Sequence, residues 1–417
     1  MLIDLADAES GTSGGKAAVL ARLLAAGLPV PPGFVVPVAA YEEAAGGLDF
    51  SDPGAVRDLP GPSAALTGEI AGALVRVAGG GSVAVRSSGT GEDTAAASAA
   101  GQHDTFLGVS GAREVAEAVR GCWVSLWSER AVAYRRRQPD AVPPGIAVLV
   151  QRLVEADVAG VMFAGAGGGA EVRLEGSWGL GESVVGGRVT PDSWTVSGTT
   201  ASDRAVTRRA LGTKSTRVDR GGTGVVTREV EPADRERFCL TDEEVFRLAE
   251  LGRRTAGLLG GEQDIEWAIA GSRIWLLQAR PVTGALPGGV VAGALPAGVV
   301  GAADSTGERG FRTGTPGSAG VATGPARVVR GPGDFGRVRA GDVLVCRTTD
   351  PAWTPLFGIV AAVVTETGGL LSHAAIVARE LGLPAVLAVP DATETLTDGA
   401  MVEVDGGTGR VEVVGRG

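Results

Sequence analysis

Residues 365–384, Thr-Glu-Thr-Gly-Gly-Leu-Leu-Ser-His-Ala-Ala-Ile-Val-Ala-Arg-Glu-Leu-Gly-Leu-Pro, decide the fold of the C-terminal part of this chain. The apolar run 359–364 predicts a buried strand, and the glycine pair 368–369 predicts a turn. The residues from His373 onward predict an amphipathic helix that ends at Gly382. His373 is thus expected at a helix N-terminus, where free N–H groups and the helix dipole stabilise added negative charge. Because neutral imidazole is also a nucleophile, the stretch suits a side chain that receives a phosphoryl group.

The simpler explanation of His373 is structural. A lone histidine beside an apolar helix is more often a packed or surface residue than a catalytic one. The chain has only one other histidine, His103, so a metal cluster built on histidines is not expected. The residues around His373 are what favour a functional role.

These residues resemble the phosphohistidine (swivelling) domain of the family that includes pyruvate phosphate dikinase, phosphoenolpyruvate synthase and rifampin phosphotransferase. The matching segments are 349–357, 368–369, 372–375, 378–379 and 382–386. The dikinases usually have Thr, Ser or Asn two residues before the histidine, whereas Leu371 agrees with the apolar residue of the rifampin-type enzymes. The resemblance implies that His373 is the catalytic phosphocarrier, and Leu371 weakens the expectation that pyruvate is the acceptor.

Composition argues against several classes of protein. Among 417 residues, 48 carboxylates outnumber 38 basic side chains, so neither nucleic acid nor an anionic membrane is expected as the main partner. The three cysteines are scattered without metal-binding spacing, as is typical of a reduced cytoplasmic protein. No N-terminal signal and no apolar run of membrane-spanning length is visible. We therefore expect a cytoplasmic protein.

Two glycine-rich motifs near the N-terminus place cations beside flexible backbone. Residues 11–24 predict a glycine turn that leads into a helix with Lys16 at its start. The spacing is not that of a Walker sequence. A lysine after a glycine turn is more commonly an exposed residue at a helix start than a phosphate ligand. A strand delivers Arg86 to a polar loop, and a second loop of small residues, with Gly101 and Thr105, follows. A cation and a run of N–H groups can close over a polyphosphate. Two solvated loops are the alternative.

A predicted hairpin has the clearest chemistry of the N-terminal part. Two strands with alternating apolar residues flank a turn at Gly271, so that Glu266 and Gln278 can face one site. Paired oxygen ligands on neighbouring strands suit an Mg²⁺ ion that also bridges nucleotide phosphates. Arg280 projects from the same face as Gln278 and can neutralise phosphate charge. A structural ion pair of Glu266 is the alternative.

Residues 147–154 and 159–163 predict two adjacent buried strands. Together with the motifs above, residues 1–283 resemble the ATP-grasp domain of the same family. The resemblance implies that Glu266 and Gln278 hold Mg²⁺. It also implies that Mg²⁺·ATP is bound by Lys16, Arg86, Gly101, Thr105, Gln151, Glu266, Gln278 and Arg280.

The expected fold class is α/β (α+β). Residues 1–283 are expected to form an ATP-grasp-type nucleotide-binding domain, and residues 284–312, rich in Gly, Ala and Pro, a linker. Residues 313–417 are expected to form a small swivelling β/β/α phosphohistidine domain. No acceptor-binding domain of the family is recognisable among these residues.

The leading hypothesis is an ATP-dependent, AMP-forming phosphotransferase. It would pass the β-phosphoryl group of ATP through His373 to an unidentified small molecule, for example an antibiotic or a specialised metabolite. The alternative is a phosphocarrier subunit of a split dikinase whose acceptor domain is a separate protein. A third hypothesis is an ATP-grasp ligase, which would form ADP and would not need His373; the complete histidine motif argues against it.

Overall fold

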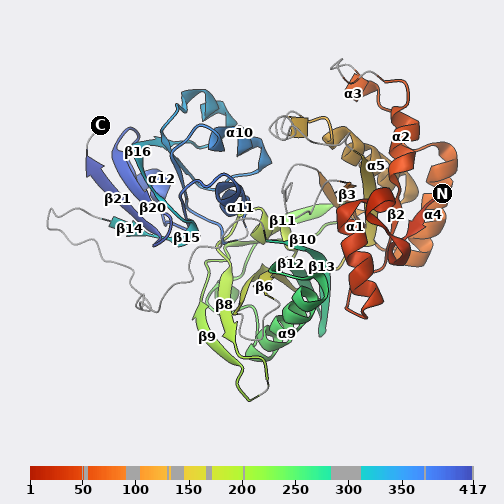
Figure 1. Cartoon of the computed structure of the whole chain (residues 1–417), viewed down its shortest axis with the longest axis horizontal. Helices are drawn as coiled ribbons and strands as arrows, with labels where there is room; N and C mark the ends of the chain where they lie inside the picture. Colours follow the sequence, from red (N-terminus) through yellow and green to blue (C-terminus); the bar gives the residue numbers. More distant parts are fainter. Residues whose placement is uncertain are drawn as a thin grey trace. The chain divides into compact units, whose positions relative to one another are not determined.

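The computed structural model describes residues 1–48, 50, 55–90, 104–128, 131–132, 145–165, 171–200, 202–282, 311–370 and 372–415. The chain divides into two compact units, which are coloured along the sequence in Figure 1. Unit 1 consists of Met1–Val185 and Pro191–Thr283, and unit 2 of Gly186–Thr190 and Gly284–Gly417. Each unit has its own sheets and its own buried apolar clusters.

A five-stranded antiparallel sheet forms one layer of unit 1. Its spatial order is β1 (Ile3–Asp4), β2 (Gly33–Val36), β5 (Ile146–Arg152), β3 (Val83–Gly89) and β4 (Thr105–Val109). Successive side chains of β5 point to opposite faces. Leu149 packs in the cluster that contains α1 (Ser10–Ala25), whereas Val148 packs in the cluster of α4 (Ala64–Ala78) and α5 (Ala112–Ser125). Residues 146–150 of this strand are all apolar because both of its faces are covered. Short helices complete the region: η1 (Leu5–Asp7), α2 (Val38–Ala45) and α3 (Ala55–Asp58).

A six-stranded antiparallel sheet forms the other layer of unit 1. Its order is β13 (Arg273–Pro281), β12 (Gln263–Ala270), β6 (Val158–Ala164), β7 (Val172–Trp178), β8 (Asp192–Ser197) and β9 (Ala205–Ala210). The helix α9 (Asp242–Leu259) covers one face of this sheet (Figure 1), and its Leu248 packs in one cluster with Ile265 and Trp267. Because side chains alternate along β12, Glu266 points to the opposite face. The remaining elements of the unit are β10 (Thr216–Arg220), β11 (Val225–Glu229), α7 (Glu182–Val185) and α8 (Pro232–Arg235).

Unit 2 is built on an eight-stranded mixed sheet. Its order is β14 (Phe311–Thr313), β21 (Arg410–Gly415), β20 (Met401–Asp405), β16 (Val321–Val328), β17 (Val343–Cys346), β18 (Ala362–Thr365), β19 (Ala385–Leu387) and β15 (Thr315–Ser318). The four strands from β16 to β19 are parallel. Helices and turns follow these strands: η2 (Pro332–Arg337), η3 (Pro351–Trp353), α10 (Thr354–Phe357), α11 (His373–Glu380) and α12 (Ala392–Thr395). Alternate residues of β18 join two cores, with Val363 beside α10 and α11 and Val364 on the other face.

The local structure predicted around His373 is confirmed. The apolar run leads into β18, and α11 begins at His373 with Ser372 as its N-cap. Gly382 has φ 63°, which ends the helix in a left-handed conformation that glycine adopts without strain. The predicted α/β class is likewise confirmed by the mixed helices and strands of both units.

Two other local predictions need correction. The glycine turn before Lys16 is a kink within α1, because Gly14 alone has non-helical angles (φ 75°, ψ 170°). The strands predicted at 147–154 and 159–163 are present, but they are not adjacent: β5 and β6 belong to different sheets of unit 1. Buried strands that follow each other in sequence carry no local signal of their pairing partners.

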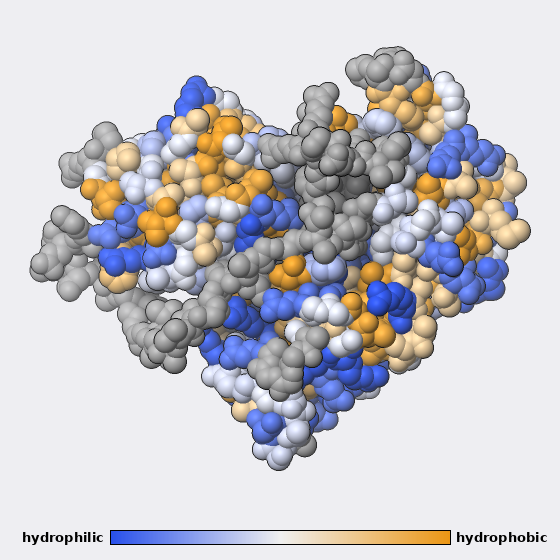
Figure 2. Space-filling view, in the orientation of Figure 1, coloured by the Kyte–Doolittle hydropathy of each residue, from blue (hydrophilic) through white to orange (hydrophobic). Residues whose placement is uncertain are grey.

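Several predicted features lie outside the described residues, namely Gly101, His103, Leu371 and most of the linker 284–312. The predicted domain boundaries therefore stay a prediction. Among the described helices, none is long and apolar enough to cross a bilayer. Large exposed apolar side chains such as Val75, Leu211 and Val321 are far apart in sequence, and Figure 2 shows apolar and polar residues interspersed over the visible surface.

Candidate functional site

The imidazole of His373 is held from both sides by hydroxyl groups. Thr349 Oγ1 lies 2.9 Å from Nδ1, and Thr354 Oγ1 lies 3.3 Å from Nε2. The ring of Phe357 meets the imidazole edge to face, with centroids 5.9 Å apart and an interplanar angle of 82°. His373 is 7% exposed. These contacts fix the ring plane at the first turn of α11, beside the backbone N–H groups that favour negative charge.

The turn before His373 depends on one glycine. Gly368 has φ 112°, and a Cβ at that position would lie 3.0 Å from Ser372 Oγ. The Ser372 hydroxyl donates to the carbonyl oxygen of Gly369 over 2.9 Å, which closes the turn. A side chain at position 368 would therefore displace the N-cap from which His373 starts.

A short segment of unit 2 from an earlier part of the sequence supports the same turn. The carbonyl oxygen of Gly187 accepts hydrogen bonds from the hydroxyls of Thr348 (2.9 Å) and Thr367 (2.6 Å). Gly187 has φ 64°, and a Cβ there would lie 3.0 Å from the Cβ of Ser372. The paired glycines at 186–187 are the one sequence signal of this role, and the role could not be predicted from them alone.

A second cluster of predicted residues forms in unit 1 around Arg86. The Arg86 guanidinium donates to Glu266 Oε2 over 3.0 Å and to Gln278 Oε1 over 2.6 Å, and it also donates to the carbonyl oxygen of Leu277 over 2.8 Å. Glu266 and Gln278 are directly paired in the β12–β13 ladder, so their side chains share a face of the sheet. The two predicted metal ligands and the predicted phosphate-binding arginine therefore meet at one point.

The glycine kink of α1 lies directly against β3, the strand that bears Arg86. A Cβ at Gly14 would overlap the backbone of Ser88, and the Ser88 hydroxyl accepts a hydrogen bond from the N–H of Ala17 over 3.3 Å. Lys16 thus lies in α1 two residues after the kink that packs on the strand of Arg86. Only a glycine permits this approach, since the backbone conformation is left-handed and the space is already filled.

The other predicted nucleotide ligands have these surroundings. Arg280 forms an ion pair with Asp264, 2.8 Å between Nη2 and Oδ2, on the strand pair that also bears Glu266. Gln151 is buried, and its amide donates to the carbonyl oxygen of Pro31 over 2.9 Å. Thr105 is exposed at the start of β4, opposite Arg86 in the ladder. Arg280 and Gln151 therefore already hold protein partners.

The donor set at Arg86 suits one metal class. Within the described residues, no three or more His, Cys, Asp or Glu side chains gather as a metal site. Glu266 and Gln278 supply only two oxygen-bearing side chains, which is too few for an all-protein cage. Mg²⁺ commonly binds through one or two protein oxygens together with water and substrate phosphates. The pair therefore fits a magnesium ion that arrives with a nucleotide.

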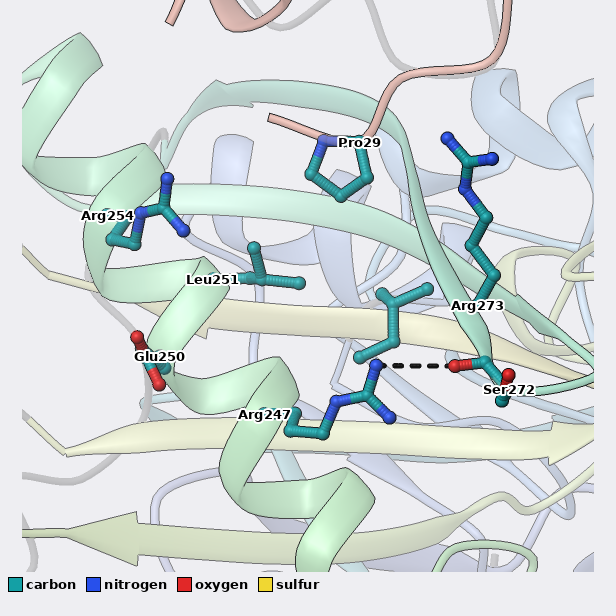
Figure 3. Close-up of a pocket in the computed structure, with 8 residues that line it drawn as sticks. Pro29, Arg247, Glu250, Leu251, Arg254, Ser272 and Arg273 are labelled. Carbon is teal, nitrogen blue, oxygen red and sulfur yellow. Dashed lines mark hydrogen bonds between the residues drawn. The ribbon is translucent and has the colours of Figure 1, made fainter. Parts of the chain in front are cut away.

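A hollow of about 510 Å³ lies elsewhere in unit 1, as the close-up in Figure 3 shows. Arg247 of α9 donates to the carbonyl oxygen of Ser272 there over 3.2 Å. Leu251 and Ile274, which also line the hollow, pack on the α9 side of the sheet. The hollow is therefore on the face opposite Glu266, and none of the predicted nucleotide ligands within the described ranges lines it.

The structure therefore brings predicted residues together around Arg86 in unit 1 and around His373 in unit 2. Residues 63–287 match the family model described as "Pyruvate phosphate dikinase, AMP/ATP-binding domain", and residues 338–409 match "PEP-utilising enzyme, mobile domain". The chain therefore belongs to the PEP-utilising dikinase family, as its motifs implied. The first match contains Arg86, Glu266 and Gln278, and the second contains His373.

Curated relatives are phosphoenolpyruvate synthases by name. A probable phosphoenolpyruvate synthase from Methanothermobacter thermautotrophicus is 36% identical over 445 residues, which cover 98% of this chain and 62% of the relative. The phosphoenolpyruvate synthase of Escherichia coli is 39% identical over 348 residues, which cover 79% of this chain and 43% of the relative. The phosphoenolpyruvate synthase of Aeropyrum pernix is 35% identical over 463 residues, which cover 95% of this chain and 56% of the relative. The chain thus spans between 43% and 62% of the length of these relatives.

Proposed function

We propose that this chain is an ATP-dependent phosphotransferase in which His373 carries a phosphoryl group from the nucleotide to an acceptor. The supporting observation is the imidazole at the first residue of α11, with a threonine hydroxyl within hydrogen-bond distance of each ring nitrogen. A ring with a fixed plane is oriented for in-line attack, and such orientation is a large part of the catalysis of phosphoryl transfer. The helix N-terminus favours the negative charge that the ring would receive.

We assign the nucleotide phosphates to the cluster of Arg86, Glu266 and Gln278. When Mg²⁺ is bound, the oxygens of Glu266 and Gln278 would hold it, and the ion supplies charge neutralisation on the phosphates. Arg86 would then exchange its contacts with these oxygens for contacts with phosphate oxygens, which it binds in the same planar geometry. Lys16, Gly101, Thr105, Gln151 and Arg280 remain the other proposed contacts.

The proposed chemistry has balanced steps. An imidazole nitrogen of His373 donates its lone pair to the β-phosphorus of ATP, and the bond from that phosphorus to the α,β-bridging oxygen breaks. The electron pair leaves with AMP. Attack on the γ-phosphorus then breaks its bond to the β,γ-bridging oxygen and leaves a monophosphoryl histidine. Water as the nucleophile gives free phosphate, and a second acceptor takes up the γ-phosphoryl group instead. That phosphoryl group passes to the acceptor, which restores the neutral ring.

The acceptor is proposed from the names of the relatives. Phosphoenolpyruvate synthases, by name, produce phosphoenolpyruvate, so pyruvate is the first acceptor to test. Another small molecule, or an acceptor site on a separate protein, is the second candidate. The second candidate rests on Leu371, which departs from the residue usual in the dikinases.

The test is a nucleotide product assay combined with intact mass, performed on wild type, His373→Ala and His103→Ala. We expect ATP to give AMP and an acid-labile added mass in wild type and in His103→Ala, and neither in His373→Ala. His103 is a matched control because it is the only other histidine of the chain. Addition of pyruvate is expected to discharge the added mass and to produce phosphoenolpyruvate.

Each contrary outcome has a definite meaning. ADP from all three proteins without any added mass would refute the phosphohistidine mechanism and favour the ligase hypothesis. If His373 is phosphorylated but pyruvate does not discharge it, pyruvate as the acceptor is refuted while the phosphohistidine mechanism stands. Other metabolites and partner proteins would then be tested as acceptors.

A further inference from the structure

The two threonines that contact His373 differ in their surroundings. Thr349 is 2% exposed, and its hydroxyl is the nearer one, 2.9 Å from Nδ1. Thr354 is partly exposed, and its hydroxyl lies 3.3 Å from Nε2. Nδ1 therefore faces the interior of unit 2, and Nε2 faces the side that another molecule can reach. A reacting phosphorus must approach from that accessible side.

A neutral imidazole has one N–H and one lone pair, and the two hydroxyls can stabilise either tautomer. For Nε2 to react, the proton must be on Nδ1, where it is donated to Thr349 Oγ1. Thr354 must then donate its own hydroxyl hydrogen to the Nε2 lone pair. In the opposite tautomer both hydroxyls reverse their roles, and the accessible nitrogen has no lone pair to offer.

We propose that Thr354 is a positioning residue that keeps Nε2 of His373 unprotonated by donating its hydroxyl hydrogen to it, and that this hydrogen bond passes to a phosphoryl oxygen when Nε2 is phosphorylated. The second half rests on the proposed function of His373. The first half concerns the chain without nucleotide.

The short segment that bears both threonines has the rigidity that this role requires. Asp350 caps η3 by accepting a hydrogen bond from the N–H of Ala352 over 2.8 Å, and prolines occupy positions 351 and 355. Phe357, at the end of the same segment, packs its ring against the imidazole. Rotation of Thr354 between staggered side-chain conformers moves its hydroxyl without moving this backbone.

The transfer step needs no additional proton carrier. The Nε2 lone pair forms the bond to phosphorus while the hydroxyl of Thr354 rotates to a phosphoryl oxygen and keeps its hydrogen. The Nδ1 proton remains on the ring and continues to be donated to Thr349. The positive charge on the phosphorylated ring is offset by the negative phosphoryl oxygens, one of which accepts the Thr354 hydrogen bond.

The test uses nitrogen NMR of the histidine rings, which needs no nucleotide. The protein is labelled with ¹⁵N-histidine and measured at a pH above about 8, where an ordinary imidazole is neutral. The two histidines are assigned with His103→Gln. The variants are Thr354→Val, which keeps the β-branched shape without the hydroxyl, Thr354→Ser, which keeps the hydroxyl, and Thr349→Val.

We expect wild type and Thr354→Ser to show a lone-pair ¹⁵N shift at Nε2 of His373 and an N–H shift at Nδ1. Thr354→Val is expected to populate the Nε2–H tautomer, and Thr349→Val to populate it fully. With ATP, we expect Thr354→Val to form phosphohistidine about tenfold more slowly, as for the loss of one hydrogen bond, with unchanged affinity for ATP and with rescue by serine.

Two NMR results would overturn the inference: a wild-type ring protonated mainly on Nε2, or identical ring shifts in wild type and Thr354→Val. A tenfold slower rate that serine does not rescue would assign Thr354 a packing role instead. If wild type forms no phosphohistidine, the proposed function and the second half of the inference fail together, while the tautomer result still decides the first half.

Discussion

The ion pair between Arg86 and Glu266 allows a quantitative test of the candidate nucleotide site. The two side chains are 3.0 Å apart, and their exposed fractions are 12% and 23%. Coulomb's law with an effective dielectric constant of about 20 sets an upper limit of roughly 5 kcal/mol at this distance. Exposed pairs contribute about 0.2–1 kcal/mol, and hydrogen bonds to charged groups about 1.5–3 kcal/mol. We therefore expect a coupling free energy of about 1–3 kcal/mol.

A double-mutant cycle isolates this coupling from the other contacts of Arg86. Wild type, Arg86→Gln, Glu266→Gln and the double variant are unfolded in urea without nucleotide, with tryptophan fluorescence as the signal. Six of the seven tryptophans belong to unit 1, so this signal reports mainly the unit that contains the pair. The control cycle uses Arg220 and Glu155, which are also 3.0 Å apart but are 37% and 58% exposed.

The expected coupling for the control pair is below about 1 kcal/mol because water and salt screen exposed charges. A coupling between Arg86 and Glu266 no larger than that of the control would refute the geometry described for the cluster. The proposed function adds a second expectation: with Mg²⁺ and ATP present, the coupling should decrease, because Arg86 would bind phosphate oxygens instead of Glu266.

Three further predictions concern groups outside the two clusters. Lys214→Met should lower the free energy of unfolding by about 3–5 kcal/mol in a denaturation experiment. Lys214 and Asp192 form a fully buried pair at 2.6 Å, and the substitution leaves the carboxylate buried without its cation. A loss below about 1 kcal/mol would contradict this expectation. Asp405→Asn should remove a stabilisation that depends on pH. Burial raises the pKa of Asp405, but the hydrogen bonds from Thr408 and Gly407 and the charge of Arg410 outweigh burial, so the net pKa is lowered. The carboxylate therefore stabilises the fold above its unfolded pKa of about 3.9, and this contribution is lost as the pH falls through the lower folded pKa. Urea unfolding at several pH values should show wild type and Asp405→Asn converging in acid, and a constant difference would contradict the assignment. Cys239 and Cys346 should not react with a thiol reagent in the native protein, because burial raises both pKa values and the thiolate is the reactive form; Asp192 near Cys239 and Glu366 near Cys346 add to the effect. Both should react after unfolding in denaturant. Modification of either cysteine in the native protein would contradict the buried position of its thiol.

Local sequence patterns were sufficient to predict the secondary-structure elements that bear His373, Glu266 and Gln278. The β18–turn–α11 unit was predictable because an apolar run, a glycine pair and a helical period are properties of neighbouring residues. The β12–β13 hairpin was predictable for the same reason, and its register directly pairs Glu266 with Gln278. Family membership followed from short motifs of this kind and is confirmed by two family models.

Long-range contacts were decided by tertiary structure alone. Arg86 meets Glu266 across 180 positions of sequence, and this contact depends on how two separate sheets of unit 1 pack. The pairing of Lys214 with Asp192 is equally remote from any local pattern. Thr349 and Thr354 reach His373 because parallel strands bring the segments that follow them to the same edge of the sheet. Hydrophobic period and turn residues specify which elements form, whereas the packing of their buried faces specifies which side chains meet.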